Sequence, residues 1–172
     1  MSLLWISLLL ISALPLLATA AAPQDCSDGQ CSDDDRAGVM ATITRFSWIM
    51  DHGKPEEMAQ VFTSDVKVNG KAIGLATMIK MVGGIQAKYV ATQHLMGNHQ
   101  INVDSSGDTA TAKSYVRAMH RKKPEHGGDT YNMVGWYEDK LVHKAGGWRI
   151  KERLLGIQWE EGEKAPAPAT KK

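Results

Sequence analysis

Three polar side chains have the types needed for acid–base chemistry: Asp51, His94 and His120. A carboxylate beside an imidazole fixes the tautomer of the ring and stabilises its charged form, so the pair can take up or release a proton near neutral pH. A second histidine would supply the opposite half of the proton transfer. Because the three residues are far apart in the sequence, the fold must bring them together.

Each of these residues also has a structural interpretation. Asp51 precedes His52-Gly53 and would be the turn residue of a helix end. A histidine in a strand is more often a hydrogen-bonded structural group than a catalyst. We expect no metal or other cofactor, because no pair of ligands stands at the i, i+4 spacing of a helical metal site. The remaining histidines lie in turns or exposed settings and are expected at the surface: His52, His99, His126 and His143.

The segment before Asp51 has the pattern of an amphipathic helix. Ser32-Asp33-Asp34-Asp35 offers N-cap side chains and negative charge for the helix start. One apolar face follows at spacings of four, three and four: Val39, Ile43, Phe46 and Met50. Gly53 fits the helix end, which leaves Asp51 just beyond the buried stripe.

Two further helices and a short strand are expected next. A second helix begins at Pro55, and its apolar side consists of Met58, Val61 and Phe62. Residues 66–68 alternate like a strand and run into the turn Asn69-Gly70. A third helix is predicted from 75 to 82, closed by Gly83-Gly84.

The second half reads as sheet, with strands expected at 92–103, 109–121, 130–142 and 148–159. Side chains in a strand alternate between its faces. Mostly small residues share one face of the second of these strands: Ala110, Ala112, Ser114, Val116, Ala118 and His120. Such a face leaves room, and His120 at its end would point into that room.

Helices followed by hairpin-linked strands predict an α+β fold. We expect a curved antiparallel sheet that forms an open cone, with the N-terminal helices packed on its concave face. The domain is expected at residues 36–159, between a linker at 23–35 and a disordered tail at 160–172 that contains Ala-Pro-Ala-Pro-Ala-Thr.

The N-terminus resembles an export signal. Leu3 to Leu17 is almost wholly apolar, and Ala18-Thr19-Ala20 provides small residues for signal peptidase, so residues 1–22 are predicted to be a signal peptide of a secreted protein. A signal anchor is the minority alternative, because the apolar run approaches the length of a membrane span. Cys26 and Cys31 either pair as a local disulfide or stay free thiols, and their spacing is a poor zinc signal.

The charge balance argues against two classes of partner. Lys plus Arg number 20 and Asp plus Glu 19, which gives a formal net charge of +1. Binding to nucleic acid or to an anionic membrane requires a concentrated basic field, so neither partner is expected once a signal peptide is removed. The expected partner is a small apolar metabolite.

Several motifs resemble those of SnoaL-like proteins. Residues 48–53, followed by 58–62, look like their opening helices, in which an aspartate marks the pocket. Residues 92–97 are similar to the segment of scytalone dehydratase that carries its first catalytic histidine, and residues 117–120 match the register of the second. Residues 135–139 and 147–150 resemble the closing strands of the same superfamily, which includes nuclear transport factor two.

The resemblance covers about residues 37–159 and implies a cone-shaped α+β fold with Asp51, His94 and His120 as catalytic residues. It also implies a lyase or isomerase that needs no cofactor, acting in secondary metabolism.

The sequence departs from the dehydratase in its polar groups. The tyrosine that precedes the pocket aspartate is replaced by Met50, and a second tyrosine expected near Asn69-Gly70 is absent. The dehydratase also has a serine and an asparagine in its penultimate strand. Here their places are held by about Tyr131 and Met133, so this polar pair is missing unless Asn132 substitutes through a register shift. We therefore expect a more apolar pocket, lined by Met50, Met96, Met119 and Met133. Tyr115 or Tyr131 would donate a hydrogen bond to a substrate oxygen.

Three hypotheses follow. The first is an enzyme that dehydrates, cyclises or isomerises a polyketide-, terpenoid- or aromatic-like metabolite. The second is a non-catalytic small-molecule-binding protein of the same fold, which the missing polar groups favour. The third is an interaction protein that forms a homodimer or homotrimer through the open sheet face, where Trp136, Tyr137 and Trp148 would lie unless they belong to the core.

Overall fold

The computed structural model describes residues 33–166. The predicted signal peptide, nearly all of the predicted linker and the Cys26–Cys31 pair lie outside the described residues. No helix within residues 33–166 is long and apolar enough to cross a membrane.

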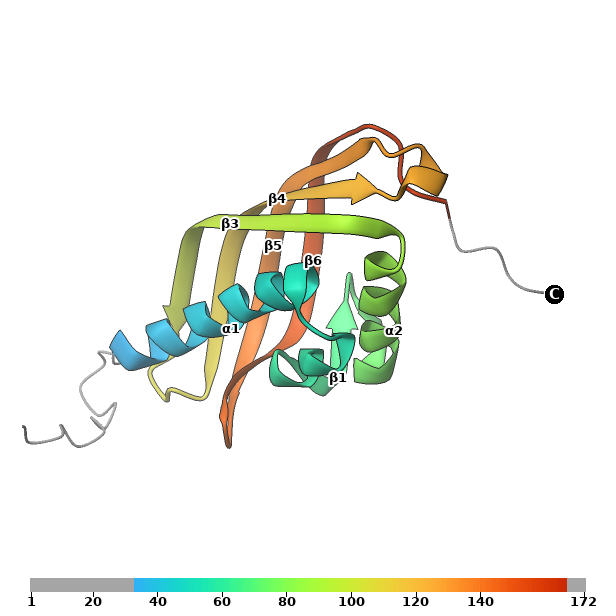
Figure 1. Ribbon diagram of the computed structural model, residues 1–172. Helices are drawn as coiled ribbons and strands as arrows, with labels where there is room; N and C mark the ends of the chain where they lie inside the picture. Colours follow the sequence, from blue (N-terminus) through green and yellow to red (C-terminus); the bar gives the residue numbers. More distant parts are fainter. Residues whose placement is uncertain (1–32, 167–172) are drawn as a thin grey trace, which may run out of the picture.

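Helix α1 (Asp33–His52) lies across the face of the sheet and contacts strands at both of its ends (Figure 1). Its apolar stripe is buried as the spacing predicted, from Val39 to Met50. The helix approaches the sheet closely at Gly38, where an added Cβ would lie 2.7 Å from the Trp148 ring. The Thr42 hydroxyl lies 3.1 Å from the Trp148 carbonyl, which accepts its hydrogen bond. The N-terminal half of α1 is therefore held at a fixed place over the sheet.

The segment after α1 differs from the sequence-based expectation. Only a short 3-10 helix forms, η1 (Pro55–Gln60), and Phe62 already opens strand β1 (Phe62–Val68). Phe62 is buried as the first residue of β1, and Val61, which follows η1, is buried where its carbonyl accepts the Ile150 N–H at 2.7 Å. Their burial therefore comes from pairing with the sheet and not from a helix face. The Asn69-Gly70 turn joins β1 to the short β2 (Lys71–Ala72).

Helix α2 (Gly74–Gln86) is longer than predicted. The sequence placed its end at Gly83-Gly84, yet the helix continues through both glycines to Gln86. Gly83 packs near the ring of Pro55, with an ideal Cβ position 3.4 Å from the Pro55 Cγ. Tertiary packing thus outweighs the weak helix propensity of glycine at this point.

The sheet has six strands in the order β2-β1-β6-β5-β4-β3. The four long strands are β3 (Tyr89–Val103), β4 (Thr109–Lys122), β5 (Thr130–Lys144) and β6 (Gly147–Glu161). They pair as an antiparallel meander, while β1 pairs with β6 in parallel. The strands bend over α1 and leave an unclosed, cone-shaped sheet (Figure 1). The predicted α+β cone with helices on its concave face is confirmed.

A bulge between β5 and β6 allows part of this bend. The pairing register shifts between Val134 and Gly135. A Cβ on Gly135 would lie 2.0 Å from the Gly156 carbonyl oxygen, and a Cβ on Gly156 would lie 2.2 Å from the Trp136 ring. Only glycine fits at either position, so the two backbones approach more closely here than side chains would allow.

The structure decides one open alternative and corrects one boundary. Trp148 and Tyr137 are buried at 3% and 6% exposure, so of the two places that the sequence allowed they take the core and not an open sheet face. Strand β6 continues to Glu161, and Ala165 is buried, so the folded part extends past the boundary expected at Trp159.

A buried ion pair lies in the concave side of the sheet. Arg153 donates from Nε and Nη2 to the Asp139 carboxylate at 2.7 Å each, and the two side chains are 4% and 1% exposed. The guanidinium carbon lies 4.1 Å from the Phe46 ring centre and 4.0 Å from that of Tyr137. This sandwich joins α1 to β5 and β6, with the charge neutralised inside the core.

We predict that Arg153→Met alone lowers the free energy of unfolding by about 3–5 kcal/mol, because it leaves the Asp139 carboxylate buried without its partner. The double variant Asp139→Leu/Arg153→Met should recover most of this loss, since neither charge then remains. Urea denaturation followed by circular dichroism measures all three proteins.

Lys113→Met is the control, because Lys113 and Glu138 form an exposed pair at 3.3 Å on neighbouring strands. It should change stability by no more than about 1 kcal/mol. A double variant as unstable as Arg153→Met would contradict the assignment of the loss to an unpaired buried charge.

Candidate active site

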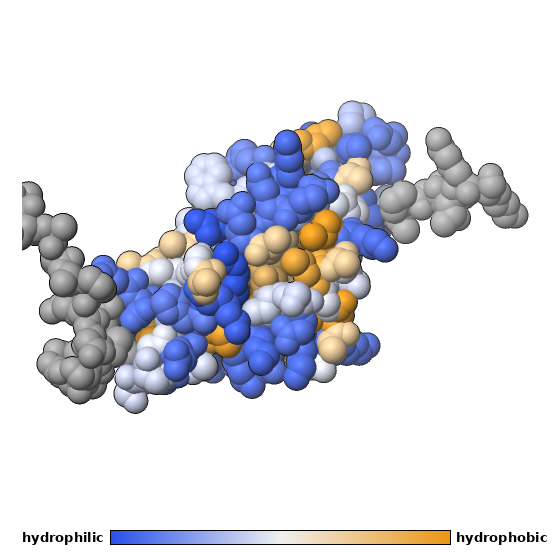
Figure 2. Space-filling view, turned by 90° about the horizontal axis from the view of Figure 1, so that it is seen from below, coloured by the Kyte–Doolittle hydropathy of each residue, from blue (hydrophilic) through white to orange (hydrophobic). Residues whose placement is uncertain are grey.

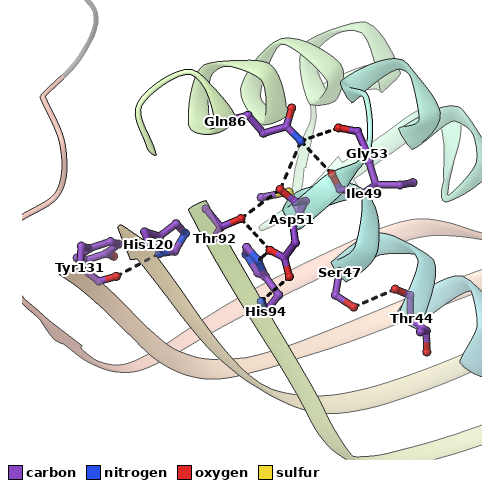
Figure 3. A network of polar contacts seen from close by, with 11 residues as sticks. Thr44, Ser47, Ile49, Asp51, Gly53, Gln86, Thr92, His94, His120 and Tyr131 are labelled. Carbon is purple, nitrogen blue, oxygen red and sulfur yellow. Dashed lines mark hydrogen bonds and ion pairs between the residues drawn. The ribbon is translucent and has the colours of Figure 1, made fainter. Parts of the chain in front are cut away.

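Asp51 lies in the last turn of α1, and its carboxylate points towards strand β3 (Figure 3). It accepts three hydrogen bonds from β3: from the Thr92 hydroxyl at 2.8 Å, from the His94 backbone N–H at 2.8 Å and from His94 Nδ1 at 2.7 Å. The carboxylate is 8% exposed and the His94 side chain 3%. Helix and strand therefore meet at a buried Asp–His pair.

The pair fixes which nitrogen of His94 carries a proton. A carboxylate only accepts hydrogen bonds, so Nδ1 is the protonated nitrogen of the neutral ring and Nε2 keeps its lone pair. Burial opposes ionisation of Asp51, but hydrogen bonds from the His94 ring, the His94 backbone and Thr92 outweigh it and hold the pKa of Asp51 below its ordinary value. Asp51 is thus a carboxylate at neutral pH and can stabilise a protonated His94.

His120 lies beside His94, on the adjoining strand β4. The two ring centres are 5.5 Å apart, with the planes nearly perpendicular. His120 Nδ1 lies 3.3 Å from the Tyr131 carbonyl oxygen, an acceptor, so this ring also keeps its Nε2 lone pair when neutral (Figure 3). Burial, together with the neighbouring His94, lowers the pKa of His120 to about 4. His120 is therefore a neutral hydrogen-bond acceptor at physiological pH.

Both histidines line a cavity of about 400 Å³. Helix α2 forms one side of it, α1 contributes Phe46 and Met50, and the curved sheet forms the rest. The lining is mainly apolar, and its principal apolar members are Phe46, Met50, Phe62, Met78, Val82, Ile85, Met133 and Leu155. Such a lining favours an apolar ligand that presents few polar groups.

The cavity has an apolar rim. Met81 and Ile157 line it and are 48% and 47% exposed. Seen from below, hydrophobic surface gathers over the part of the molecule where α2 and β1 lie, amid mostly hydrophilic surface (Figure 2). At the other end, Glu160, Lys164 and Ala165 of the C-terminal segment complete the lining. The Tyr131 hydroxyl donates to Glu160.

Of the residues that the sequence placed in the pocket, the structure brings Asp51, His94 and His120 together. Met50, Tyr131 and Met133 also line the cavity. The Tyr131 hydroxyl already donates its hydrogen bond to Glu160.

Three pocket assignments were wrong. Tyr115 is on the outer face of the sheet and 53% exposed, because it is offset by one residue from the inward face of β4. Met119 is on that same outer face for the same reason. Met96 does point inwards, but it packs against the hydrophobic core and does not reach the cavity.

One surface assignment also needs correction. His99 is half-buried in strand β3, next to a register shift, and its Nδ1 lies 2.8 Å from the hydroxyl of the buried Ser114. Burial lowers the pKa of His99. It lies outside the cavity and has a structural role.

Sequence reasoning missed several lining residues. Tyr137 shares the inward face of β5 with Tyr131 and Met133, so strand parity would have found it. No such signal marked Arg153 or the methionines of α2, because a charged residue in a strand is usually solvent-exposed and an apolar helix face usually belongs to the core. Their place in the lining depends on how β6 and α2 pack.

The site offers no metal-binding set among residues 33–166, where no three His, Cys, Asp or Glu side chains are placed to hold a metal ion. The Asp51 carboxylate is already occupied by three hydrogen-bond donors. What the arrangement can do by itself is accept a proton at one imidazole, stabilise the resulting charge and accept a hydrogen bond at another.

Comparison with known proteins gives a family. The model of the SnoaL-like domain matches residues 33–154. The uncharacterised protein Rv2910c of Mycobacterium tuberculosis is 24% identical over 128 residues, which make up 70% of this chain and 83% of that protein.

Two solved structures illustrate the likeness in fold. A candidate scytalone dehydratase from Novosphingobium aromaticivorans superimposes with a TM-score of 0.67 at 26% identity, over 81% of this chain and 95% of that one. The hexachlorocyclohexane dehydrochlorinase LinA-type3 from Novosphingobium barchaimii superimposes with a TM-score of 0.62 at 15% identity, over 76% and 93% of the two chains. The family match spans most of the described residues, and the chain belongs to the SnoaL-like family.

Proposed function

We propose that this protein is a cofactor-independent lyase or isomerase that acts by acid–base chemistry on a small apolar metabolite. The observation that carries the proposal is the 2.7 Å hydrogen bond between Asp51 and His94 at the wall of an apolar cavity. A buried carboxylate that fixes the tautomer of an imidazole is the arrangement of a general base.

In the proposed reaction, His94 Nε2 removes a proton from the substrate, and Asp51 stabilises the imidazolium that forms. The same proton then leaves His94. It joins a departing hydroxyl group as water in a dehydration, or returns to a different carbon in a double-bond shift. Either route restores His94 and requires no oxidant or metal.

His120 has a different role in this scheme. Because its neutral ring presents a lone pair at Nε2, it accepts a hydrogen bond from a hydroxyl of the substrate rather than donating a proton. The two imidazoles thus act on neighbouring atoms of one molecule, which their 5.5 Å ring separation allows.

The similar proteins support an elimination. The name of the candidate scytalone dehydratase from Novosphingobium aromaticivorans denotes loss of water. The dehydrochlorinase, whose likeness is one of fold alone, is named for loss of hydrogen chloride. The finer proposal of a polyketide-, terpenoid- or aromatic-like substrate rests on the apolar lining and on the methionine that replaces the dehydratase tyrosine before Asp51.

We predict that His94→Gln and Asp51→Asn each slow the turnover of a metabolite by about 10²–10⁴-fold, the usual contribution of a general base. Extracts of small apolar metabolites are incubated with each protein, and mass spectrometry follows the compound that wild type consumes. His99→Gln is the matched control, because it removes a half-buried, hydrogen-bonded imidazole outside the cavity.

Equal turnover by wild type and His94→Gln would refute the proposed base. If no compound is converted and one compound is retained unchanged by both proteins, the protein is a binding module and the enzymatic proposal fails.

The role of His120 leads to a pH prediction. Its pKa is about 4 in the folded protein and 6.5 in the unfolded chain. Between these values the unfolded chain binds the additional proton, so the free energy of unfolding falls as the pH is lowered from 6.5 towards 4. In His120→Gln the decrease in the free energy of unfolding that His120 causes over this pH range should be absent.

Urea denaturation at several pH values between 4 and 7 measures the slope. The exposed His143 provides the control variant, His143→Gln. His99 keeps its own share of the slope in both variants, because burial lowers its pKa as well. An unchanged slope in His120→Gln would mean that His120 is charged in the folded protein, and the acceptor role would be wrong.

A further inference from the structure

The end of α1 is tied to α2 by one side chain. The last carbonyl groups of a helix have no partner within the helix. Here Gln86 Nε2 lies 2.9 Å from the Ile49 oxygen and 3.3 Å from the Met50 oxygen in the last turn of α1, and 3.1 Å from the oxygen of Gly53, which directly follows the helix (Figure 3). The Ile49 oxygen also accepts the Gly53 N–H at 3.1 Å. One amide group therefore closes the end of α1 from outside.

This closed turn carries the Asp51 carboxylate, because Asp51 lies between the residues whose carbonyls Gln86 contacts. The Asp51 side chain is short, so the place of its carboxylate follows the backbone of the turn. Displacement of a catalytic group by about 1 Å can slow the reaction by about 10²-fold. The bonds of Gln86 thus bear directly on the Asp51–His94 distance.

Gln86 also stands next to the ligand cavity. Ile85, its neighbour in sequence, lines the cavity together with Met78 and Val82 of the same helix. Helix α2 therefore contacts the cavity along one side and the end of α1 through its last residue. A ligand that packs against α2 and the carboxylate that orients the base are held by the same helix.

We propose that Gln86 is a positioning residue: its side-chain amide holds the last turn of α1 so that Asp51 stays hydrogen-bonded to His94. The catalytic meaning of this role rests on the proposed function, but the geometric role does not. It can be measured in the resting protein without any substrate.

A general tether of α1 is the competing explanation, and the chain offers a matched control. Arg36 Nη1 donates to the Ile101 carbonyl at 2.5 Å and ties the other end of α1 to strand β3. Its removal loosens the same helix through the same kind of bond, far from Asp51.

The experiment records the proton resonance of His94 Nδ1–H and its exchange rate with water by NMR in ¹⁵N-histidine-labelled protein. The variants are Gln86→Met, which keeps an unbranched side chain but removes both donors, Gln86→Lys, which restores N–H donors, and Arg36→Met.

In Gln86→Met we expect the His94 Nδ1–H resonance to move towards that of a free imidazole. Its exchange with water should quicken by about tenfold, the effect of weakening one such hydrogen bond. Gln86→Lys should recover at least part of the wild-type signal, and Arg36→Met should retain it. Should Gln86→Met not fold, Gln86→Leu takes its place, because it also lacks N–H donors and adds no charge.

A wild-type signal in Gln86→Met overturns the proposal. Equal loss in Gln86→Met and Arg36→Met overturns it as well, since a general loosening of α1 would then explain both. Because the readout is the Asp51–His94 hydrogen bond itself, failure here is distinct from failure of the enzymatic proposal, which depends on turnover.

Discussion

The hydrogen bond between Asp51 and His94 joins the end of helix α1 to strand β3 inside the protein, and the other functional groups are arranged around it. A buried carboxylate is costly unless donors satisfy it. Three donors from β3 do so here, which fixes the helix end relative to the strand. The neighbouring strand then places His120 beside His94, and both rings reach the cavity.

The cavity exists because the sheet curves over α1 and its inward face carries small side chains. The close approach of Gly135 and Gly156 permits one bend, and Ala118 next to His120 leaves space. The one guanidinium in the lining, that of Arg153, is paired with Asp139 and sandwiched between aromatic rings. The charge of this guanidinium is thus offset, although its Nη1 has no hydrogen-bond partner within the described residues. The two imidazoles are the groups of the lining that can take up a proton beside an apolar ligand.

Local patterns predicted the fold well where burial and periodicity agree. The inward face of β4 and the buried stripe of α1 follow directly from spacings of two and of about 3.6 residues. Prediction failed at Val61-Phe62 and at Gly83-Gly84. In the first case apolar residues were assigned to a helix although a strand pairing buries them, and in the second, packing carries a helix through residues that usually end one.

The sequence by itself determined which residues could do chemistry, because Asp51, His94 and His120 stood out by type and by their place in the expected elements and family motifs. It also determined the inward faces of the strands. Only the tertiary structure decided that Asp51 pairs with His94 and not with His120, and that Gln86 closes the end of α1. These outcomes depend on how a helix end, a strand and a second helix meet. Such contacts join residues more than thirty positions apart, and no local pattern of side chains encodes them.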